Sequence, residues 1–271
     1  MDSASPQALA DLLERRFGER FEVPAELAGA DELLRIAAHA SHRQWAPQTV
    51  PAALVRVLAA CALSAPSKSD LQQATIIDVR DPTEKAAIAA LLPQLPWLGS
   101  APAFLVFCGD RYRLRRTFER RGQRFPNEHL DQFFNATVDA ALVMMNFLRA
   151  ASAAGLVHCP ISLVRNRPGD LDRLLGLPDH VFPVAGLCLG YPAAPVRARA
   201  RLPLGLTLQV DRYDDSALDE LLDTYDERCM TLRREAGAAV EAWTQEKFVQ
   251  YSVPQRTDWG TYIQSKMFSL K

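Results

Sequence analysis

The chain has 271 residues, of which 48% are hydrophobic and 23% are charged, and its formal net charge is -1. This length supports one large domain or two small ones with a substantial core, and the composition is typical of globular proteins. The near-neutral charge gives no general electrostatic attraction to nucleic acid or to a membrane surface.

Periodic placement of apolar residues predicts eight helices and four strands. Two of the expected strands are continuous apolar runs, which are typical of strands covered on both faces. The pattern therefore predicts helices around a central buried sheet. In chain order, the expected helices cover 7–20, 26–38, 50–63, 82–92, 128–154, 168–175, 216–234 and 238–250, and the expected strands cover 74–80, 103–109, 158–164 and 181–190.

The most apolar stretch is unsuited to crossing a membrane. It runs from Val138 to Leu156 and contains Asp139, Asn146 and Arg149. Three polar side chains in one span favour a buried helix over a membrane helix. The N-terminal stretch also lacks an apolar core of the signal-peptide type. We therefore expect a cytoplasmic protein without a membrane segment.

Cysteine and histidine usage predicts neither a disulfide framework nor a metal centre. The cysteine count is odd and no C-x-x-C occurs, which favours free, buried thiols in a reducing compartment. No two histidines stand at H-x-x-x-H spacing, so we expect no zinc site and no other metal. The cysteines are Cys61, Cys108, Cys159, Cys188 and Cys229.

Seven arginines crowd the segment 111–124, RYRLRRTFERRGQR. The simplest interpretation is a solvated helix face. A basic patch for a phosphorylated ligand is the alternative. Nucleic-acid binding is not expected, because few aromatic residues are interleaved with the arginines and the rest of the chain adds no basic field.

Two polar stretches follow expected helices. Residues 39–45 read HASHRQW, which suits a helix C-terminus, a solvated turn or an anion site. Ser67, Lys68 and Ser69 follow Pro66 where a helix gives way to a strand. This second stretch is either an ordinary turn or a ligand loop.

Two more polar stretches lie later in the chain, CPISLVRN at 159–166 and VRARARLP at 196–203. In the second, Arg197, Arg199 and Arg201 share one face of an extended chain. Three guanidiniums on one face repel one another unless an anion such as a phosphate lies among them. A solvated loop is the alternative. No G-x-G-x-x-G, P-loop or G-x-S-x-G motif is present, which disfavours Rossmann, P-loop and α/β-hydrolase sites.

Six motifs follow one another along residues 32–270, and their order resembles the flavin-dependent nitroreductase family. Within that family the resemblance is greatest to the oxygen-insensitive, NADPH-using A-type nitroreductases and flavin reductases. The motifs are HASHRQW at 39–45, APSKSDLQ at 65–72, APAFLVFCGD at 101–110, DAAL at 139–142, RN at 165–166 followed by PVAGLCLGYP at 183–192, and RARLP at 199–203.

The resemblance implies an α+β nitroreductase fold, with a central mixed or antiparallel sheet wrapped by helices. The expected organisation is an N-terminal helical extension at 1–30, an FMN-binding domain at 31–212 and a C-terminal helical extension at 213–271. The protein is expected to be a homodimer with FMN at the interface. It would transfer two electrons by a ping-pong reaction from NADPH or NADH to a nitroaromatic, a quinone or a free flavin.

The same resemblance implies roles for particular residues. The FMN phosphate would be held by His39, Ser41, Arg199 and Arg201. Arg43 would stabilise the negative charge that reduction leaves on the flavin. No side chain is expected to act as a general base, because the reacting centre is flavin N5.

Three further groups complete the expected site. The loop Ser67, Lys68 and Ser69 would reach the partner subunit's flavin. The backbone of Ile161, Ser162 and Leu163 would face flavin N5. Arg233 and Arg234 would bind the 2′-phosphate of NADPH.

The chain departs from the family pattern at several positions. Ala40 replaces an arginine, Lys68 replaces a small hydroxyl residue, and Ser162 and Leu163 replace two glycines, which should narrow the space above the flavin. Two alternatives therefore stay open: a flavin-dependent dehydrogenase or dehalogenase of the same fold, and a non-catalytic flavin-binding module.

Overall fold

The computed structural model describes residues 6–196 and 198–270, which group into two compact units. One unit contains residues 6–40 and 198–255, and the larger one contains residues 41–196 and 256–270. Each unit is thus assembled from segments far apart in the sequence. Arg197, the first of the three alternating arginines, lies outside the described residues.

A four-stranded sheet forms the centre of the larger unit. Its order is β1-β2-β4-β3, and every neighbouring pair is antiparallel, so the expected sheet is antiparallel rather than mixed. The strands are β1 (Ala74–Asp78), β2 (Ala103–Asp110), β3 (Val157–Ile161) and β4 (Val181–Gly190).

Strand β2 is apolar throughout because both of its faces are buried. Successive side chains of a strand point to opposite faces. Leu105 and Phe107 join the core cluster on one face, whereas Phe104 and Val106 join the cluster on the other face. Both faces are covered, so the alternation of a half-exposed strand is absent.

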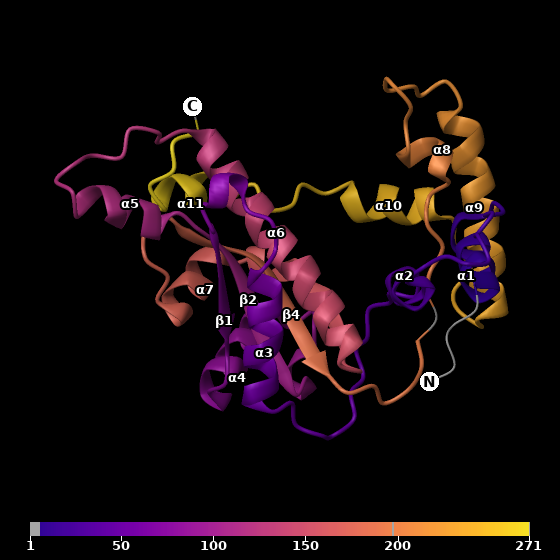
Figure 1. Ribbon diagram of the computed structural model, residues 1–271, viewed down its shortest axis with the longest axis horizontal. Coiled ribbons are helices and arrows are strands. Elements are labelled where there is room, and N and C mark those ends of the chain that lie inside the picture. The colour runs from indigo at the N-terminus through magenta and orange to yellow at the C-terminus, as the bar shows by residue number, and fades with distance from the viewer. Residues whose placement is uncertain (1–5, 197, 271) are drawn as a thin grey trace. The chain divides into compact units, whose positions relative to one another are not determined.

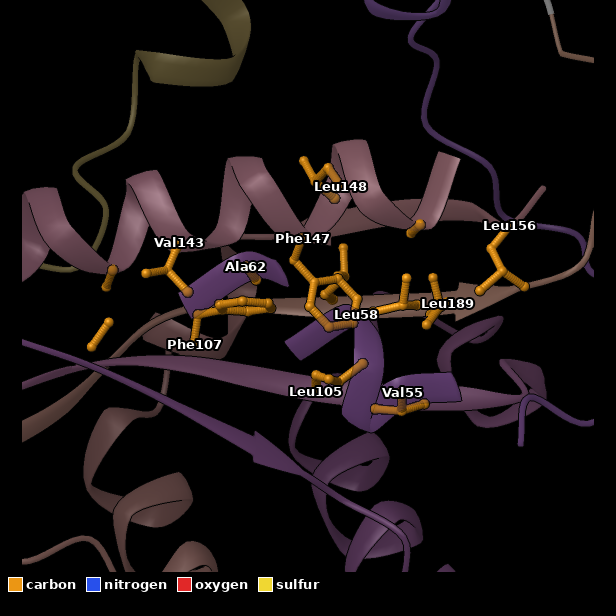
Figure 2. Packing of buried hydrophobic residues seen from close by; sticks show 14 residues of the cluster. Val55, Leu58, Ala62, Leu105, Phe107, Val143, Phe147, Leu148, Leu156 and Leu189 are labelled. Carbon is orange, nitrogen blue, oxygen red and sulfur yellow. The ribbon is translucent and has the colours of Figure 1, made fainter. Parts of the chain in front are cut away.

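Helices cover both faces of this sheet. On one face, Phe147 of α6 meets Phe107 of β2 edge to face, with ring centres 5.6 Å apart (Figure 2). Burial of each large apolar side chain contributes about 1.5–3 kcal/mol to stability. The helices of this unit are α3 (Ala52–Leu63), α4 (Pro82–Leu91), α5 (Tyr112–Glu119), α6 (Leu130–Ala153), α7 (Pro168–Leu175) and α11 (Trp259–Ser265) (Figure 1).

The smaller unit is helical. Asp226 on α9 accepts hydrogen bonds from the backbone N–H and the hydroxyl of Thr244, which caps the N-terminus of α10. Tyr225 packs edge-on against Trp243 beside this cap, with ring centres 5.6 Å apart. The helices are α1 (Pro6–Phe17), α2 (Ala30–Ala37), α8 (Leu204–Thr207), α9 (Leu218–Glu235) and α10 (Trp243–Tyr251).

All the expected helices and strands are present, and helices α5, α8 and α11 lie outside the expected ranges. Helix α2 begins at Ala30 rather than at 26, and α10 begins at Trp243 rather than at 238. Helix α1 ends at Phe17 rather than at 20, because Gly18 takes a left-handed φ of 82°. Strand β3 ends at Ile161, and the chain then forms a short 3-10 turn instead of continuing to 164. All five cysteines are free, but Cys61 is exposed rather than buried. Across residues 6–196 and 198–270, no helix is long and apolar enough to span a membrane.

Candidate functional site

Arg43 is held beside strand β3 in the larger unit. The backbone N–H of the neighbouring His42 donates to His158 O at 3.0 Å. The guanidinium carbon of Arg43 lies 5.7 Å from the centre of the Trp97 ring, and its side chain is exposed. An arginine stacked on an indole keeps a defined position while its donors stay available to a ligand.

Ser41 lies at the same edge, next to the Cys159 thiol. Burial raises the pKa of Cys159, and Arg43 and the Ser41 hydroxyl act against that rise. The thiol is therefore protonated at neutral pH and is not an activated nucleophile. Ser41 and Arg43 are thus brought together, whereas His39 belongs to the smaller unit.

The segment after β3 is seated firmly on the sheet. It forms the 3-10 turn η3 (Leu163–Arg165), and Val164 is buried. Gly186 on β4 makes room for it, because a Cβ there would lie 2.9 Å from Val164 Cγ1. Leu163 packs, partly buried, against the core cluster on this face. The bulk of Leu163 therefore contributes to packing.

Arg256 fixes the same turn from the C-terminal segment. Its Nε donates to Asn166 Oδ1 at 2.8 Å, and its Nη2 donates to Ser162 Oγ at 3.2 Å. Sequence reasoning did not include Arg256. These partners are 90 and 94 positions away along the chain, so no local pattern connects them.

Asp139 on α6 anchors the loop that contains Ser67, Lys68 and Ser69. Its carboxylate accepts from Ser67 Oγ at 2.6 Å and from Lys68 N at 3.3 Å. It also accepts from the backbone and side-chain amide of Gln73, both at 3.1 Å. Asp139 is only 2% exposed, so this buried charge is satisfied by the loop it holds. Sequence reasoning missed this role, although an acid inside an apolar helix was a usable signal.

The anchored loop has an unusual backbone. Ser69, Asp70 and Gln72 have left-handed φ values of 50°, 54° and 50°. Side chains other than glycine rarely adopt this conformation, and it persists only where surrounding contacts enforce it. Such strain is common at ligand-contacting segments. Ser67 also lines a cleft of about 1050 Å³ beside α3 and β1.

The buried Arg111 completes the support of this loop. Its Nη1 donates to Gln73 Oε1, and its guanidinium carbon lies 5.2 Å from the centre of the Phe125 ring. The segment 111–124 is thus not simply a solvated face. Three of its other arginines pair with acids, namely Arg113 with Asp110, Arg115 with Glu128 and Arg116 with Glu119.

In the smaller unit, Arg199 and Arg201 line a cleft of about 560 Å³. Neither guanidinium makes an ion pair or a side-chain hydrogen bond with another described residue. Arg15, Arg233 and Lys247 also line the cleft, and Glu246 is its one acidic lining residue. Arg15 pairs with Glu235, and Arg233 and Lys247 pair with Glu246. Arg199 and Arg201 are the lining cations without an acidic partner among the described residues, which makes this cleft suited to an anionic ligand.

The two expected NADPH-binding arginines differ in their surroundings. Arg233 pairs with Glu246 and donates to Glu241 O at 2.9 Å. Hydrogen bonds from Lys247 and Arg233 lower the pKa of Glu246 to about 2, so this acid is charged at any assay pH. Arg234 is exposed and does not line the cleft.

A model described as "Nitroreductase family" matches residues 36–191, which is more than half of the chain. The chain belongs to the nitroreductase family. A second model, described as "Nitroreductase family, C-terminal domain", matches residues 199–271 of this nitroreductase.

Individual proteins agree with this assignment. "FMN reductase (NADPH)" of Bacillus subtilis (strain 168) is 30% identical over 237 residues, covering 85% of this nitroreductase and 95% of that protein. "Oxygen-insensitive NADPH nitroreductase" of Salmonella typhimurium (strain LT2) is 35% identical over 194 residues, covering 70% and 77% of the two chains. The solved structure of NfrA2 from B. megaterium superposes with a TM-score of 0.84 at 27% identity, covering 89% and 98%.

Proposed function

We propose that this nitroreductase uses FMN to pass two electrons from NADPH or NADH to a small-molecule acceptor such as a nitroaromatic, a quinone or a free flavin. The observation that carries this function is the family match along both parts of the chain, with relatives named as FMN reductase and NADPH nitroreductase. The five free cysteines support a reducing compartment, the cytoplasm. We also propose a division into an N-terminal extension at 1–30, an FMN-binding domain at 31–212 and a C-terminal extension at 213–271, whereas the two family matches cover residues 36–191 and 199–271.

Four residues are the proposed ligands of the FMN phosphate, namely His39, Ser41, Arg199 and Arg201. Ser41 belongs to the larger unit, and the other three belong to the smaller unit. The two arginine side chains have no acidic partner among the described residues, and a buried guanidinium nitrogen nearby, Nε of Arg16, makes no hydrogen bond. Unpaired cations of this kind are stabilised by a dianion, which accepts several charge-assisted hydrogen bonds.

Other residues fit the flavin ring of FMN. When bound, FMN supplies the redox chemistry by accepting a hydride at N5. Arg43 is proposed to place a fixed positive charge where reduction develops negative charge, which stabilises the reduced state without further rearrangement. The backbone of Ile161, Ser162 and Leu163 is proposed to face N5, on a turn that Arg256 and the sheet hold in place.

The packing of Leu163 disfavours the non-catalytic alternative. That alternative requires the added bulk of residues 162 and 163 to block the flavin. Leu163 instead packs partly buried against the core, and the Ser162 hydroxyl accepts a hydrogen bond from Arg256. The side chains of Ser162 and Leu163 therefore both make contacts within the protein.

Purified protein tests the proposed function directly. We expect bound yellow flavin that is bleached by NADPH under anaerobic conditions and recovers its colour when a nitroaromatic, quinone or free flavin is added. A panel of acceptors then ranks the substrates. Flavin that binds but is not bleached by either nucleotide would support the binding-module alternative instead.

We propose that the active form is a homodimer in which α6 lies at the interface. This helix exposes an apolar stripe, with Phe134 62%, Val138 38%, Leu142 41% and Met145 43% exposed. Lys68 Nζ contacts Asp131 Oδ2 at 3.3 Å, so the start of this helix adjoins the loop that is expected to reach the partner's flavin. Exposed apolar patches of this kind mark association surfaces.

A charge on this stripe should separate the subunits. Phe134→Lys is expected to give a monomer at micromolar concentration, because the interface would have to bury an unpaired ammonium. The monomer should also lose FMN on dialysis. Sedimentation and flavin absorbance measure both effects. Tyr213→Lys, at a side chain that is 78% exposed outside the stripe, is the control and should stay dimeric. A flavin-loaded Phe134→Lys monomer would contradict the role of the loop.

We propose that Arg233 and Arg234 recognise the 2′-phosphate of NADPH. Arg233→Ala with Arg234→Ala should raise the KM for NADPH about tenfold, since one charge-assisted bond is worth about 1.5–3 kcal/mol. The KM for NADH should change less than about twofold. Arg233 forms an ion pair with Glu246. Glu246→Gln should therefore lower the KM for NADPH, because it frees the Arg233 guanidinium for the phosphate. Steady-state kinetics with both nucleotides measure this, and equal changes for NADPH and NADH would refute the assignment.

A further inference from the structure

Helix α1 lies outside the residues matched by either family model, and it contains a buried arginine. Arg16 is in the last turn of α1 and is 5% exposed. Arginine is rarely buried to this extent without a charged partner. No acidic side chain in the described part of the chain forms an ion pair with Arg16, so its burial calls for another explanation.

The contacts of Arg16 join two segments of the proposed phosphate site. Its Nη1 donates to Ala37 O, and to His39 O at 3.3 Å. Its own carbonyl accepts from Arg201 N at 2.6 Å. The Arg16 side chain thus fixes the backbone at His39, and its main-chain carbonyl fixes the backbone at Arg201. His39 and Arg201 are 162 positions apart in the sequence (201 minus 39).

The charge of Arg16 is not compensated. Its Nε is buried and makes no hydrogen bond. Burial lowers the pKa of Arg16, and repulsion from Arg201 lowers it further. Two guanidiniums at such a site are mutually unfavourable until an anion is placed between or beside them.

We propose that Arg16 is a positioning residue of the FMN phosphate site, supplied by a helix that lies outside the residues matched by the family models. Its guanidinium holds the backbone at Ala37 and His39 in place and adds buried positive charge that favours a bound dianion. Ala40 stands where the family pattern has an arginine, and Arg16 contacts carbonyls on the N-terminal side of that position. The inference rests on the proposed use of FMN.

A purely structural role is the competing explanation. A cation suits the C-terminus of helix α2, where Arg16 contacts the Ala37 carbonyl. If Arg16 has only a structural role, replacing it should weaken the binding of every flavin equally. If Arg16 belongs to the phosphate site, replacing it should weaken the binding of FMN and leave the affinity for riboflavin, which has no phosphate, nearly unchanged.

The test compares FMN and riboflavin binding to the apoprotein, followed by quenching of flavin fluorescence. Arg16→Met, which keeps the apolar stem, is expected to raise the Kd for FMN about tenfold or more and that for riboflavin less than about twofold. Arg16→Lys should restore part of the FMN affinity. Arg20→Met is the charge-matched control, because Arg20 is 91% exposed, and it should change neither Kd.

Thermal melting of the apoprotein gives a second readout. Inorganic phosphate should raise the melting temperature of the wild type and of Arg20→Met, and this increase should be lost in Arg16→Met. An equal loss of FMN and riboflavin affinity, or unchanged FMN affinity, would overturn the role of Arg16. If Arg16→Met does not fold, the ratio of the Kd for FMN to the Kd for riboflavin is measured for Arg16→Lys instead. A ratio equal to that of the wild type would overturn the role of Arg16. A wild-type protein that binds no flavin would instead overturn the proposed function itself.

Discussion

Replacing Asp139 with alanine should lower the free energy of unfolding by about 3–5 kcal/mol. The change removes a buried carboxylate that accepts hydrogen bonds from Ser67, Lys68 and Gln73. Each buried donor left without a partner costs about 1–3 kcal/mol. The buried Arg111 would also lose a nearby negative charge that favours its ionised form.

The same change should release the strained loop. Left-handed backbone at a residue other than glycine costs about 1–2 kcal/mol, and this loop contains three such residues. Without its anchor, the loop should relax to ordinary conformations. We therefore expect Asp139→Ala to weaken FMN retention by the dimer as well as stability, because the proposed contact with the partner's flavin would be lost.

Urea unfolding and FMN titration measure the two effects. Asp139→Asn keeps the shape but replaces one acceptor with a donor, so it should lie between the wild type and alanine. Asp131→Ala is the control on the same helix, since Asp131 is exposed and should leave unfolding almost unchanged. Stability of Asp139→Ala within about 1 kcal/mol of the wild type would show that the network contributes little.

The second large effect concerns the cofactor. Arg199→Ala combined with Arg201→Ala should raise the Kd for FMN by about a hundredfold or more. Each charge-assisted hydrogen bond contributes about 1.5–3 kcal/mol, and about 1.4 kcal/mol corresponds to a factor of ten. Riboflavin affinity should change little, because it lacks the phosphate that these arginines are proposed to bind.

Flavin occupancy after dialysis, followed by titration, checks this result. Arg120→Ala with Arg121→Ala removes the same charge from the exposed end of the segment 111–124 and should leave the Kd unchanged. This control also tests whether that segment binds a phosphorylated ligand. Full occupancy in the Arg199 and Arg201 double variant would exclude these two residues from the phosphate site.

The sequence alone determined the four strands and eight of the helices, because hydrophobic periodicity is a local property, but it left open whether the sheet is mixed or antiparallel. The run 181–190 is apolar at nearly every position, and it forms strand β4 with these bounds, covered on both faces. The order of short motifs also predicted the nitroreductase family, since each motif consists of neighbouring residues. Where the bounds were wrong, as at Gly18, one residue's backbone preference ended the helix.

Only the tertiary structure decided which polar groups support one another. Asp139 meets Ser67 across 72 positions, and Arg16 reaches His39 across 23 positions. A hydrogen bond depends on distance and direction in space, and neither is encoded in the spacing of two distant residues. For the same reason, composition predicted one solvated arginine face at 111–124, whereas folding buried Arg111 and paired three of its neighbours with acids.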